Sequence, residues 1–379
     1  MTQKTYETST VHITEATEAT AVTEATLSTV DKVFASVLGY METIAIAIGD
    51  RLGYYRALEG TDMTSTELAS TTGTHERYTR EWLEQQAVCG YLEVVAGGED
   101  QVHSFALAPG VSGALAHPHE LTTMAPMARM LAAAAAAAQW TRIADAARSG
   151  NGLSWREYGA DMRESQGDIN DPPLRMLLAD AWLSAGLPDL RRRLDAGEPL
   201  RIADVGCGAG WASIRLATRF PNITVDAYDI DPASIELARR NVDEAGLTRR
   251  VRVVGQDLTQ DAPSAEYDLV VAVECIHDMA HPVPVLSAMR TMVRRDGAVL
   301  VIDEKVADEF TAPGDDVEKL MYGYSVLVCL PDAMSGNPTG ATGTVIRRSA
   351  MEGYARDAGF SNVEVLPVEH DVWRFYRLS

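Results

Sequence analysis

The chain has 379 residues, enough for two or three domains of ordinary size with well-developed cores. Its 54 acidic and 33 basic residues give a net charge of −21, which argues against nucleic acid as a partner. The four cysteines include no C-x-x-C pair, so we expect reduced thiols and a cytoplasmic protein.

Residues 1–26 are rich in Thr, Glu and Ala and lack the regions of a signal peptide, which predicts a disordered tail. Apolar residues at helical spacing follow from Val30 to Ala57, more than one domain needs to cover, which favours a dimerisation helix and a homodimer. No uninterrupted apolar stretch reaches the roughly 18 residues of a membrane span, so we expect a soluble chain without a membrane partner.

A winged helix is predicted within residues 27–115. A short helix at 65–69 and a second from His75 to Cys89 precede two β-rich segments that flank Gly97 and Gly98. Such a domain could read DNA by placing its second helix in the major groove, or it could serve dimerisation. Five basic residues stand against twelve acidic ones between Leu27 and Leu115, so dimerisation is favoured.

The most informative motif is a turn with Asp204 before glycines at 206, 208 and 210, between an apolar strand and a helix. Such glycines permit a sharp turn and let a ligand lie against bare main chain. The spacing differs from G-x-G-x-x-G, which places a pyrophosphate on the helix N-terminus. The turn therefore predicts a nucleoside cofactor without a pyrophosphate.

Two further acids stand at or near the ends of predicted strands. Asp229 closes the strand 223–229 about 20 residues beyond the glycines, where a carboxylate can accept both ribose hydroxyls. The segment 251–258 predicts a third strand, in which Asp257 suits an adenine amino group.

The rest of the sheet follows from β-rich runs. The segments 267–273 and 297–303 are nearly continuous apolar runs, typical of strands buried on both faces. The segments 362–366 and 371–378 predict an antiparallel hairpin. The loop from Glu274 to Met279 lies at the carboxyl end of the fourth strand, the edge where open α/β sheets bind ligands.

These motifs, in this order, resemble those of the class I S-adenosylmethionine-dependent methyltransferases. The resemblance implies an α/β fold, in which a Rossmann-like mixed sheet with a C-terminal antiparallel hairpin spans residues 198–379, and S-adenosylmethionine as cofactor. It assigns Asp204 to the methionine amino group, Asp229 to the ribose, and Asp257 with Leu258 to the adenine. The expected cofactor contacts are Asp204, Gly206, Gly208, Gly210, Asp229, Ile230, Asp257, Leu258 and Glu274.

A winged-helix dimerisation domain (27–115), a helical linker (116–197) and this sheet form a layout similar to that of small-molecule O-methyltransferase-like enzymes. Enzymes of that group occur in plants and in bacterial natural-product pathways. Local sequence runs such as residues 47–55 resemble those of a bacterial branch of the group. In this resemblance His277 and Asp278 match a His-Asp pair whose histidine is the general base. Met279 departs from the family by replacing the aromatic residue that usually follows the pair.

Histidine suits a base because its pKa lies near neutrality. Glu274 is a second candidate, either at the cofactor's methionine end or beside a substrate amine. We expect an apolar or aromatic acceptor, because Trp, Tyr, Met and Cys side chains are frequent in the linker and after the fifth strand. The expected substrate contacts are Trp182, Tyr322, Tyr324 and Arg347.

Several alternatives remain open at this point. Arg347 could meet an acceptor carboxylate or pair on the surface. His277 and His281 do not supply the three or four converging ligands of a metal site, so no metal is expected. Methylation at nitrogen or carbon, a non-methylating reaction of the sulfonium, and a cofactor-sensing winged-helix regulator are the other functions that the same sequence allows.

Overall fold

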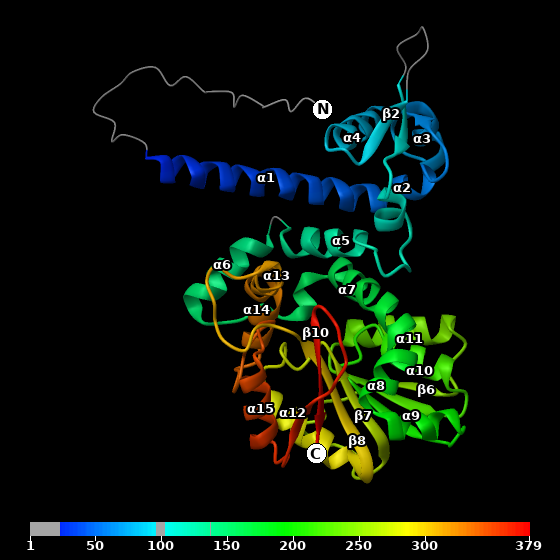
Figure 1. The fold of residues 1–379 in the computed structure, drawn as a ribbon, viewed down its shortest axis with the longest axis vertical. Helices are drawn as coiled ribbons and strands as arrows, with labels where there is room; N and C mark the ends of the chain where they lie inside the picture. Colours follow the sequence, from blue (N-terminus) through cyan, green and yellow to red (C-terminus); the bar gives the residue numbers. More distant parts are fainter. Residues whose placement is uncertain (1–22, 96–102, 137) are drawn as a thin grey trace.

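The computed structural model describes residues 23–95, 103–136 and 138–379. The predicted tail therefore lies outside the described residues up to residue 22, and residues 23–26 form the N-cap and first turn of helix α1. A winged-helix domain, a layer of helices and an α/β domain follow one another along the molecule (Figure 1).

The predicted winged helix is confirmed. Its three strands form a sheet of order β1-β3-β2, in which β2 and β3 make the antiparallel wing. The predicted helix of residues 30–57 is wrong in one respect, because Gly53, with a φ of 74°, separates α1 from α2. The elements are α1 (Glu24–Arg51), α2 (Tyr54–Ala57), β1 (Met63–Thr64), α3 (Ser65–Thr72), α4 (Glu76–Val88), β2 (Leu92–Val95) and β3 (Ser104–Leu107).

The last turns of α1 belong to the winged-helix core. Trp82 of α4 donates its indole N–H to the carbonyl of Ala45 at 2.8 Å and packs against the ring of Tyr54. Only glycine fits at position 49, since a Cβ there would lie 2.3 Å from the Trp82 ring. Helix α1 is also long and apolar enough to cross a membrane by length and composition alone. Its charged residues Asp31, Lys32 and Glu42 interrupt the apolar sequence, so the expectation that no uninterrupted apolar stretch reaches roughly 18 residues is not contradicted.

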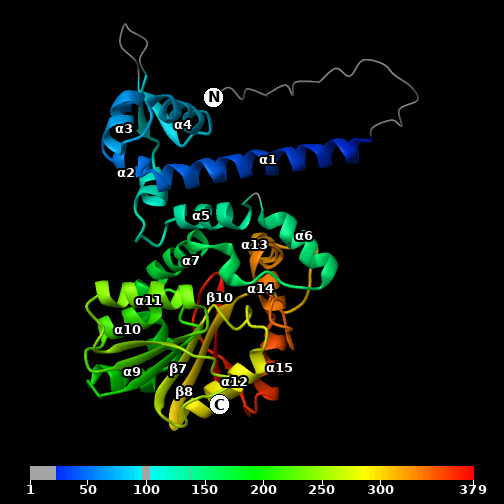
Figure 2. The same cartoon turned by 180° about the vertical axis from the view of Figure 1, so that it is seen from behind.

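A layer of helices connects the two domains. Helix α1 lies along α5, and α5 packs on α7, as the two opposite views agree (Figures 1 and 2). Arg129 of α5 pairs with Asp50 of α1 at 2.7 Å and with Asp168 of α7 at 2.6 Å. The helices of this layer are η1 (Ser112–Ala116), α5 (Ala125–Ala134), α6 (Gln139–Ser149), η2 (Trp155–Tyr158), α7 (Ala160–Pro173), η3 (Leu174–Trp182), α8 (Leu183–Gly186) and α9 (Pro188–Asp195).

The α/β domain is built on the predicted mixed sheet of seven strands, in the order β6-β5-β4-β7-β8-β10-β9. The first five strands are parallel, whereas β10 runs antiparallel to both β8 and β9 and so confirms the expected hairpin. The strands are β4 (Arg201–Val205), β5 (Thr224–Asp229), β6 (Val251–Gly255), β7 (Tyr267–Val273), β8 (Val293–Glu304), β9 (Val363–Val365) and β10 (Trp373–Leu378).

Helices cover both faces of this sheet, which is why β7 is buried along its whole length. The segment after β8 forms α13, η4 and α14 and packs against the helical layer, where Tyr158 donates to the carbonyl of Leu327 at 2.7 Å. The remaining helices are α10 (Trp211–Arg219), α11 (Pro232–Glu244), α12 (Pro282–Met292), α13 (Asp316–Tyr324), η4 (Ser325–Cys329), α14 (Leu330–Met334) and α15 (Arg348–Asp357).

Trp182 joins the helical layer to the sheet. Its ring lies 5.4 Å from the ring of Trp373 and 5.1 Å from that of Phe375, and its side chain is 3% exposed. Such edge-to-face contacts add to the stabilisation that comes from burying large aromatic surfaces.

Trp182→Ala should therefore lower the free energy of unfolding by about 3–5 kcal/mol, because the cavity left behind cannot collapse fully. Urea titration followed by circular dichroism measures this change. Trp140→Ala is the matched control, since Trp140 is 59% exposed and its loss should cost no more than about 0.5 kcal/mol. Equal costs for the two variants would contradict the assignment of Trp182 to the core.

Candidate active site at the carboxyl edge of the sheet

A cavity of about 840 Å³ lies at the carboxyl ends of β4, β5 and β7, where the sequence places the ligand site. The helical layer and the segment after β8 close it from the other side, because α7, η2 and η4 all contribute to its wall. It brings together ten of the residues predicted from the sequence, which are Asp204, Gly206, Gly208, Asp229, Ile230, Asp257, Leu258, Glu274, His277 and Tyr324.

The glycine turn forms one wall of the cavity. Gly206 and Gly208 have φ values of 70° and 52°, which side chains rarely allow, and nothing lies within 4 Å of the point where Gly208 would carry a Cβ. Gly167 of α7 packs directly on this turn, since a Cβ there would be 2.8 Å from that of Ala209. Gly210 lies outside the cavity lining as the N-cap of α10, facing Ala238 of α11, so we assign it a structural role in place of the expected cofactor contact.

Two carboxyl groups lie on either side of the turn. Asp204, at the end of β4, accepts a hydrogen bond from the Ser213 hydroxyl at 2.7 Å, and burial raises its pKa to about 6. Asp229, at the end of β5, accepts from the backbone N–H groups of Gly208 at 2.8 Å and Asp231 at 2.9 Å. Burial raises the pKa of Asp229 as well. A carboxylate has about four lone-pair sites, so Asp229 keeps acceptor capacity toward the cavity.

The loop after β6 forms the wall next to Asp229. Asp257 accepts from the N–H and the hydroxyl of Thr259 at 2.9 and 2.7 Å, which holds the loop in a tight turn. Leu258 is 6% exposed, whereas Ile230 is 73% exposed at the mouth of the cavity. An apolar side chain on each side of this wall suits a flat, aromatic ligand group.

Glu274 follows β7 in a strained conformation, with a φ of 49°. Its carboxyl group accepts from the indole N–H of Trp373 and from the Gln166 amide at 3.1 Å. Burial raises the pKa of Glu274, although the Trp373 hydrogen bond and the nearby His277 oppose the shift. A non-glycine residue in this region costs of order 1–3 kcal/mol, and such positions cluster at functional sites.

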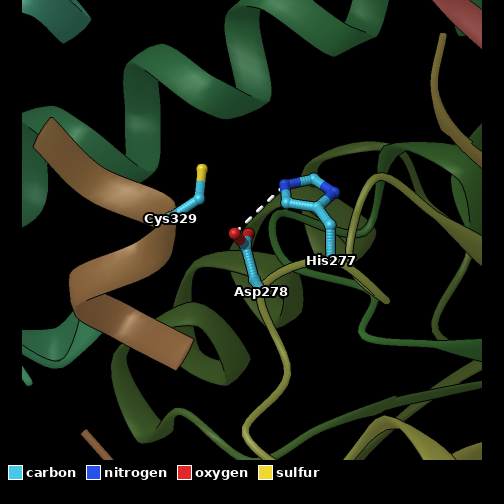
Figure 3. Close-up of side chains that lie close together, drawn as sticks. All are labelled: His277, Asp278 and Cys329. Carbon is cyan, nitrogen blue, oxygen red and sulfur yellow. Dashed lines mark ion pairs between the residues drawn. The ribbon is translucent and has the colours of Figure 1, made fainter. Parts of the chain in front are cut away.

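His277 is held between two carboxylates. Its Nδ1 lies 2.5 Å from Asp303 Oδ1, and its Nε2 lies 3.0 Å from Asp278 Oδ1 (Figure 3). Burial alone would lower the pKa of His277, but Asp278 and Asp303 outweigh burial and raise the pKa well above its usual value. The imidazolium form is therefore favoured at neutral pH, and the basic form grows only at higher pH.

Cys329 of η4 approaches the same pair (Figure 3). One donor atom from each of His277, Asp278 and Cys329 lies within 4.8 Å of the others, so these three side chains could also hold a metal ion. In the arrangement seen here His277 and Asp278 pair with each other, and burial raises the pKa of the Cys329 thiol to about 12. The expectation of no metal site thus stays a prediction.

Three of the four predicted substrate contacts lie outside the cavity lining. Trp182 is part of the core described above, where it cannot reach a ligand. Arg347 pairs with Glu318 and donates to the Tyr322 hydroxyl at 3.3 Å, so these two side chains satisfy each other next to the exposed ring of Phe310. Only Tyr324 lines the cavity.

Glu304, Asp332 and Thr344 are among the polar residues of the lining that were not predicted from the sequence. Glu304 directly follows the predicted fifth strand, and an acid at that strand end was the available signal. Asp332 and Thr344 belong to the segment after β8, where no periodic pattern indicates which side chains turn inward. Burial, with Asp278 nearby, raises the pKa of Asp332 to about 7.

Comparisons with known proteins agree with this architecture. Residues 202–297 match the model described as a methyltransferase domain, and residues 41–100 match that of the Rv2258c-like winged HTH domain. A malonyl-[acyl-carrier protein] O-methyltransferase of Halalkalibacterium halodurans is 30% identical over 115 residues, which cover 30% of this chain and 42% of that enzyme. The chain thus spans less than two thirds of the curated relatives that head the comparison.

Solved structures match over almost the whole chain. The mitomycin 7-O-methyltransferase MmcR aligns with a TM-score of 0.67 at 19% identity, covering 93% of this chain and 98% of that one. The human N-acetylserotonin methyltransferase in complex with SAM aligns with a TM-score of 0.60 at 17% identity, covering 95% and 99%. The chain therefore combines a methyltransferase domain with an Rv2258c-like winged helix-turn-helix domain, in the fold that these methyltransferase structures share.

Proposed function

We propose that this protein transfers a methyl group from S-adenosylmethionine to a hydroxyl oxygen of a small-molecule acceptor, with His277 as the general base. The observation that carries this proposal is the position of His277, fixed by Asp303 in the same cavity as the glycine turn and Asp229. The solved structures that align over more than nine tenths of the chain include methyltransferases of small molecules, which supports an acceptor of that class.

The cofactor end of the cavity fits S-adenosylmethionine. Open space beside Gly208 leaves room for a ligand against the main chain, and Asp229 has free acceptor capacity for a diol. Asp204 and Glu274 line the same region and suit the amino group of the methionine part. When bound, the cofactor supplies an electrophilic methyl group on a sulfonium.

His277 would take the proton of the acceptor hydroxyl. Asp303 accepts from Nδ1 and so fixes the ring orientation, which directs Nε2 toward Asp278 and the cavity. A positioned base contributes typically 10²–10⁴-fold to such a step, while alignment of the acceptor contributes the rest. Because His277 favours the protonated form, the active fraction of the enzyme should increase with pH.

A DNA-binding regulator is a weaker candidate. The second helix of the winged helix, α4, carries Arg77 and Arg80, and each pairs with a glutamate of the same helix, Arg77 with Glu81 at 2.5 Å and Arg80 with Glu76 at 2.7 Å. Arginines neutralised within their own helix offer little to a phosphate backbone, which is bound through the release of counterions. These contacts favour an enzyme without a nucleic-acid partner.

We further propose a cytoplasmic homodimer, with a role in secondary metabolism, in which α1 of one copy covers α1 of another. The described residues of α1 from 24 to 41 are exposed, and their apolar members form one stripe along the helix. A soluble protein rarely leaves such a stripe uncovered. The exposed apolar side chains of this part are Leu27, Val30, Val33, Phe34, Val37, Leu38, Tyr40 and Met41.

Asp229→Ala should weaken the binding of S-adenosylhomocysteine by about 1.5–3 kcal/mol, the usual range for hydrogen bonds to a charged group. Calorimetry on the purified variant measures the change. Asp243→Ala, at an exposed position of α11, is the matched control and should bind as the wild type does. Unchanged affinity in Asp229→Ala would mean that the cofactor binds elsewhere.

His277→Ala should lower kcat by about 10²–10⁴-fold and leave the affinity for S-adenosylhomocysteine within about twofold, because a base acts in the transition state. The wild-type rate should rise with pH through a pKa above the usual 6.5 of histidine. Asp278→Asn removes one of the two carboxylates that raise this pKa, so it should move the rise to lower pH.

Rates measured with methyl-labelled cofactor between pH 5.5 and 9.5 test these expectations. Near-full turnover in His277→Ala would rule out the proposed base and favour an acceptor nitrogen or carbon. A collapse of cofactor affinity in the same variant would assign His277 to the binding site instead.

Phe34→Glu should dissociate the dimer, because it places a charge in the apolar stripe of α1, where Phe34 is 61% exposed. Ser36→Glu is the matched control, since it adds the same charge on the opposite face of the helix. Light scattering at micromolar concentration compares the two masses. A wild-type protein that is monomeric under these conditions would disprove the homodimer.

A further inference from the structure

Six buried polar atoms of the cavity lining lack a hydrogen-bond partner among the described residues, and three of the six belong to the end of β8 and the segment that follows it. These three are Oε2 of Glu304, the hydroxyl of Tyr324 and the hydroxyl of Thr344. Most buried polar groups in proteins are hydrogen-bonded, since an unpaired group loses its interactions with water without replacement. Several such atoms around one cavity indicate that a bound ligand supplies their hydrogen-bond partners.

Of the three residues, Glu304 gives the strongest indication of the ligand's chemistry. It is the last residue of β8, it is 6% exposed, and the pairing of β8 with β10 fixes it opposite Trp373. The backbone N–H of Glu304 donates to the carboxylate of Asp303 at 2.9 Å. The side chains of these two neighbouring acids have different surroundings. Asp303 orients His277, whereas the carboxyl group of Glu304 lines the cavity.

The surroundings of Glu304 carry negative charge. Glu274 and Asp278, which also line the cavity, are close enough to Glu304 to act on its carboxyl group. Burial is the main cause that raises the pKa of Glu304 well above its usual value, and the negative charge of the nearby Glu274 is the second. A group that is costly to ionise without a partner gains most when a cation is placed beside it.

Few positive groups of the protein can play that part. The cavity lining contains two arginines, Arg156 and Arg163, and no lysine. Arg163 donates to the carbonyl of Arg156 at 3.4 Å and lies 4.0 Å from Asp231, which places it at the cofactor end. His277 is already shared by Asp278 and Asp303. The carboxyl group of Glu304 is therefore available to bind a positive group of the ligand.

We propose that the acceptor carries a protonated amine, which binds Glu304 with the Tyr324 hydroxyl beside it, while the hydroxyl to be methylated reaches His277. An ammonium group has three N–H donors, so it can serve both Oε2 of Glu304 and the oxygen of Tyr324. The rest of the wall includes Met130, Met321 and Val328, which suits an apolar or aromatic body. This inference rests on the proposed function and names the acceptor class within it.

The test uses three ligands of one skeleton and different charge: 2-phenylethylamine, 2-phenylethanol and phenylacetate. Calorimetry with the full chain saturated with S-adenosylhomocysteine compares their affinities at pH 7. The amine should bind about 10-fold to 100-fold more tightly than the alcohol, as expected for a charge-assisted hydrogen bond in a buried site, and phenylacetate should bind least.

Glu304→Gln keeps the shape of the side chain and removes its charge, so the preference for the amine should fall to within about threefold. Glu309→Gln is the matched control, because Glu309 is exposed and outside the cavity lining. Tyr324→Phe removes one acceptor of the ammonium group and should weaken amine binding alone. This second variant keeps the test decisive even if Glu304→Gln does not fold.

Equal affinities for the three ligands, or no binding of any, would overturn the proposal. A preference for the amine that survives in Glu304→Gln would also overturn it, as would tightest binding of phenylacetate. The affinity of each protein for S-adenosylhomocysteine is measured in a separate titration, before the protein is saturated with it. If S-adenosylhomocysteine does not bind, the proposed function is wrong. If it binds normally but the amine is not preferred, only the proposed acceptor class is wrong.

Discussion

The site depends on one buried carboxylate, that of Asp303. It is fully buried at the end of β8 and accepts three hydrogen bonds, from Nδ1 and the backbone N–H of His277 and from the N–H of Glu304. Because β8 pairs with both β7 and β10, this position is fixed by the sheet itself. The loop that carries Glu274 and His277 is thereby tied to the neighbouring strand, and the strained backbone of Glu274 is held in place.

A second consequence is electrostatic. Carboxyl groups approach the cavity from four strand ends, those of β4, β5, β7 and β8, and burial raises the pKa of Asp204, Asp229, Glu274 and Glu304 alike. Such a cavity favours ligands that bring positive charge and disfavours negatively charged ones. A sulfonium cofactor is more positive than the sulfide that remains after methyl transfer. The same acids would therefore bind the sulfonium cofactor more tightly than the sulfide product.

The cofactor end could be predicted from the sequence because local rules determine it. Glycines with positive φ, an acid at a strand end and the pairing of parallel strands bring Gly208 and Asp229 within 2.8 Å of each other. The acceptor end could not be predicted in the same way. Trp182 and Tyr324 are both aromatic residues of helical segments, and only tertiary packing decides that the first joins the core while the second lines the cavity. For Arg347 the structure agrees with the second alternative, pairing with an acid, and its partner Glu318 could not be identified beforehand because it is distant in the sequence.

The winged-helix domain is connected to the site by a short series of contacts. Arg129 of α5 binds Asp50 at the end of α1 and Asp168 in the middle of α7. Helix α7 in turn places Gly167 against the glycine turn and Gln166 on the carboxyl group of Glu274. A shift of α7 by a fraction of an ångström would alter both contacts, because close-packed interiors transmit strain. The helix proposed to form the dimer is thus connected through α5 and α7 to the cavity wall, so a dimer contact at α1 would influence the position of α7 without touching the cavity.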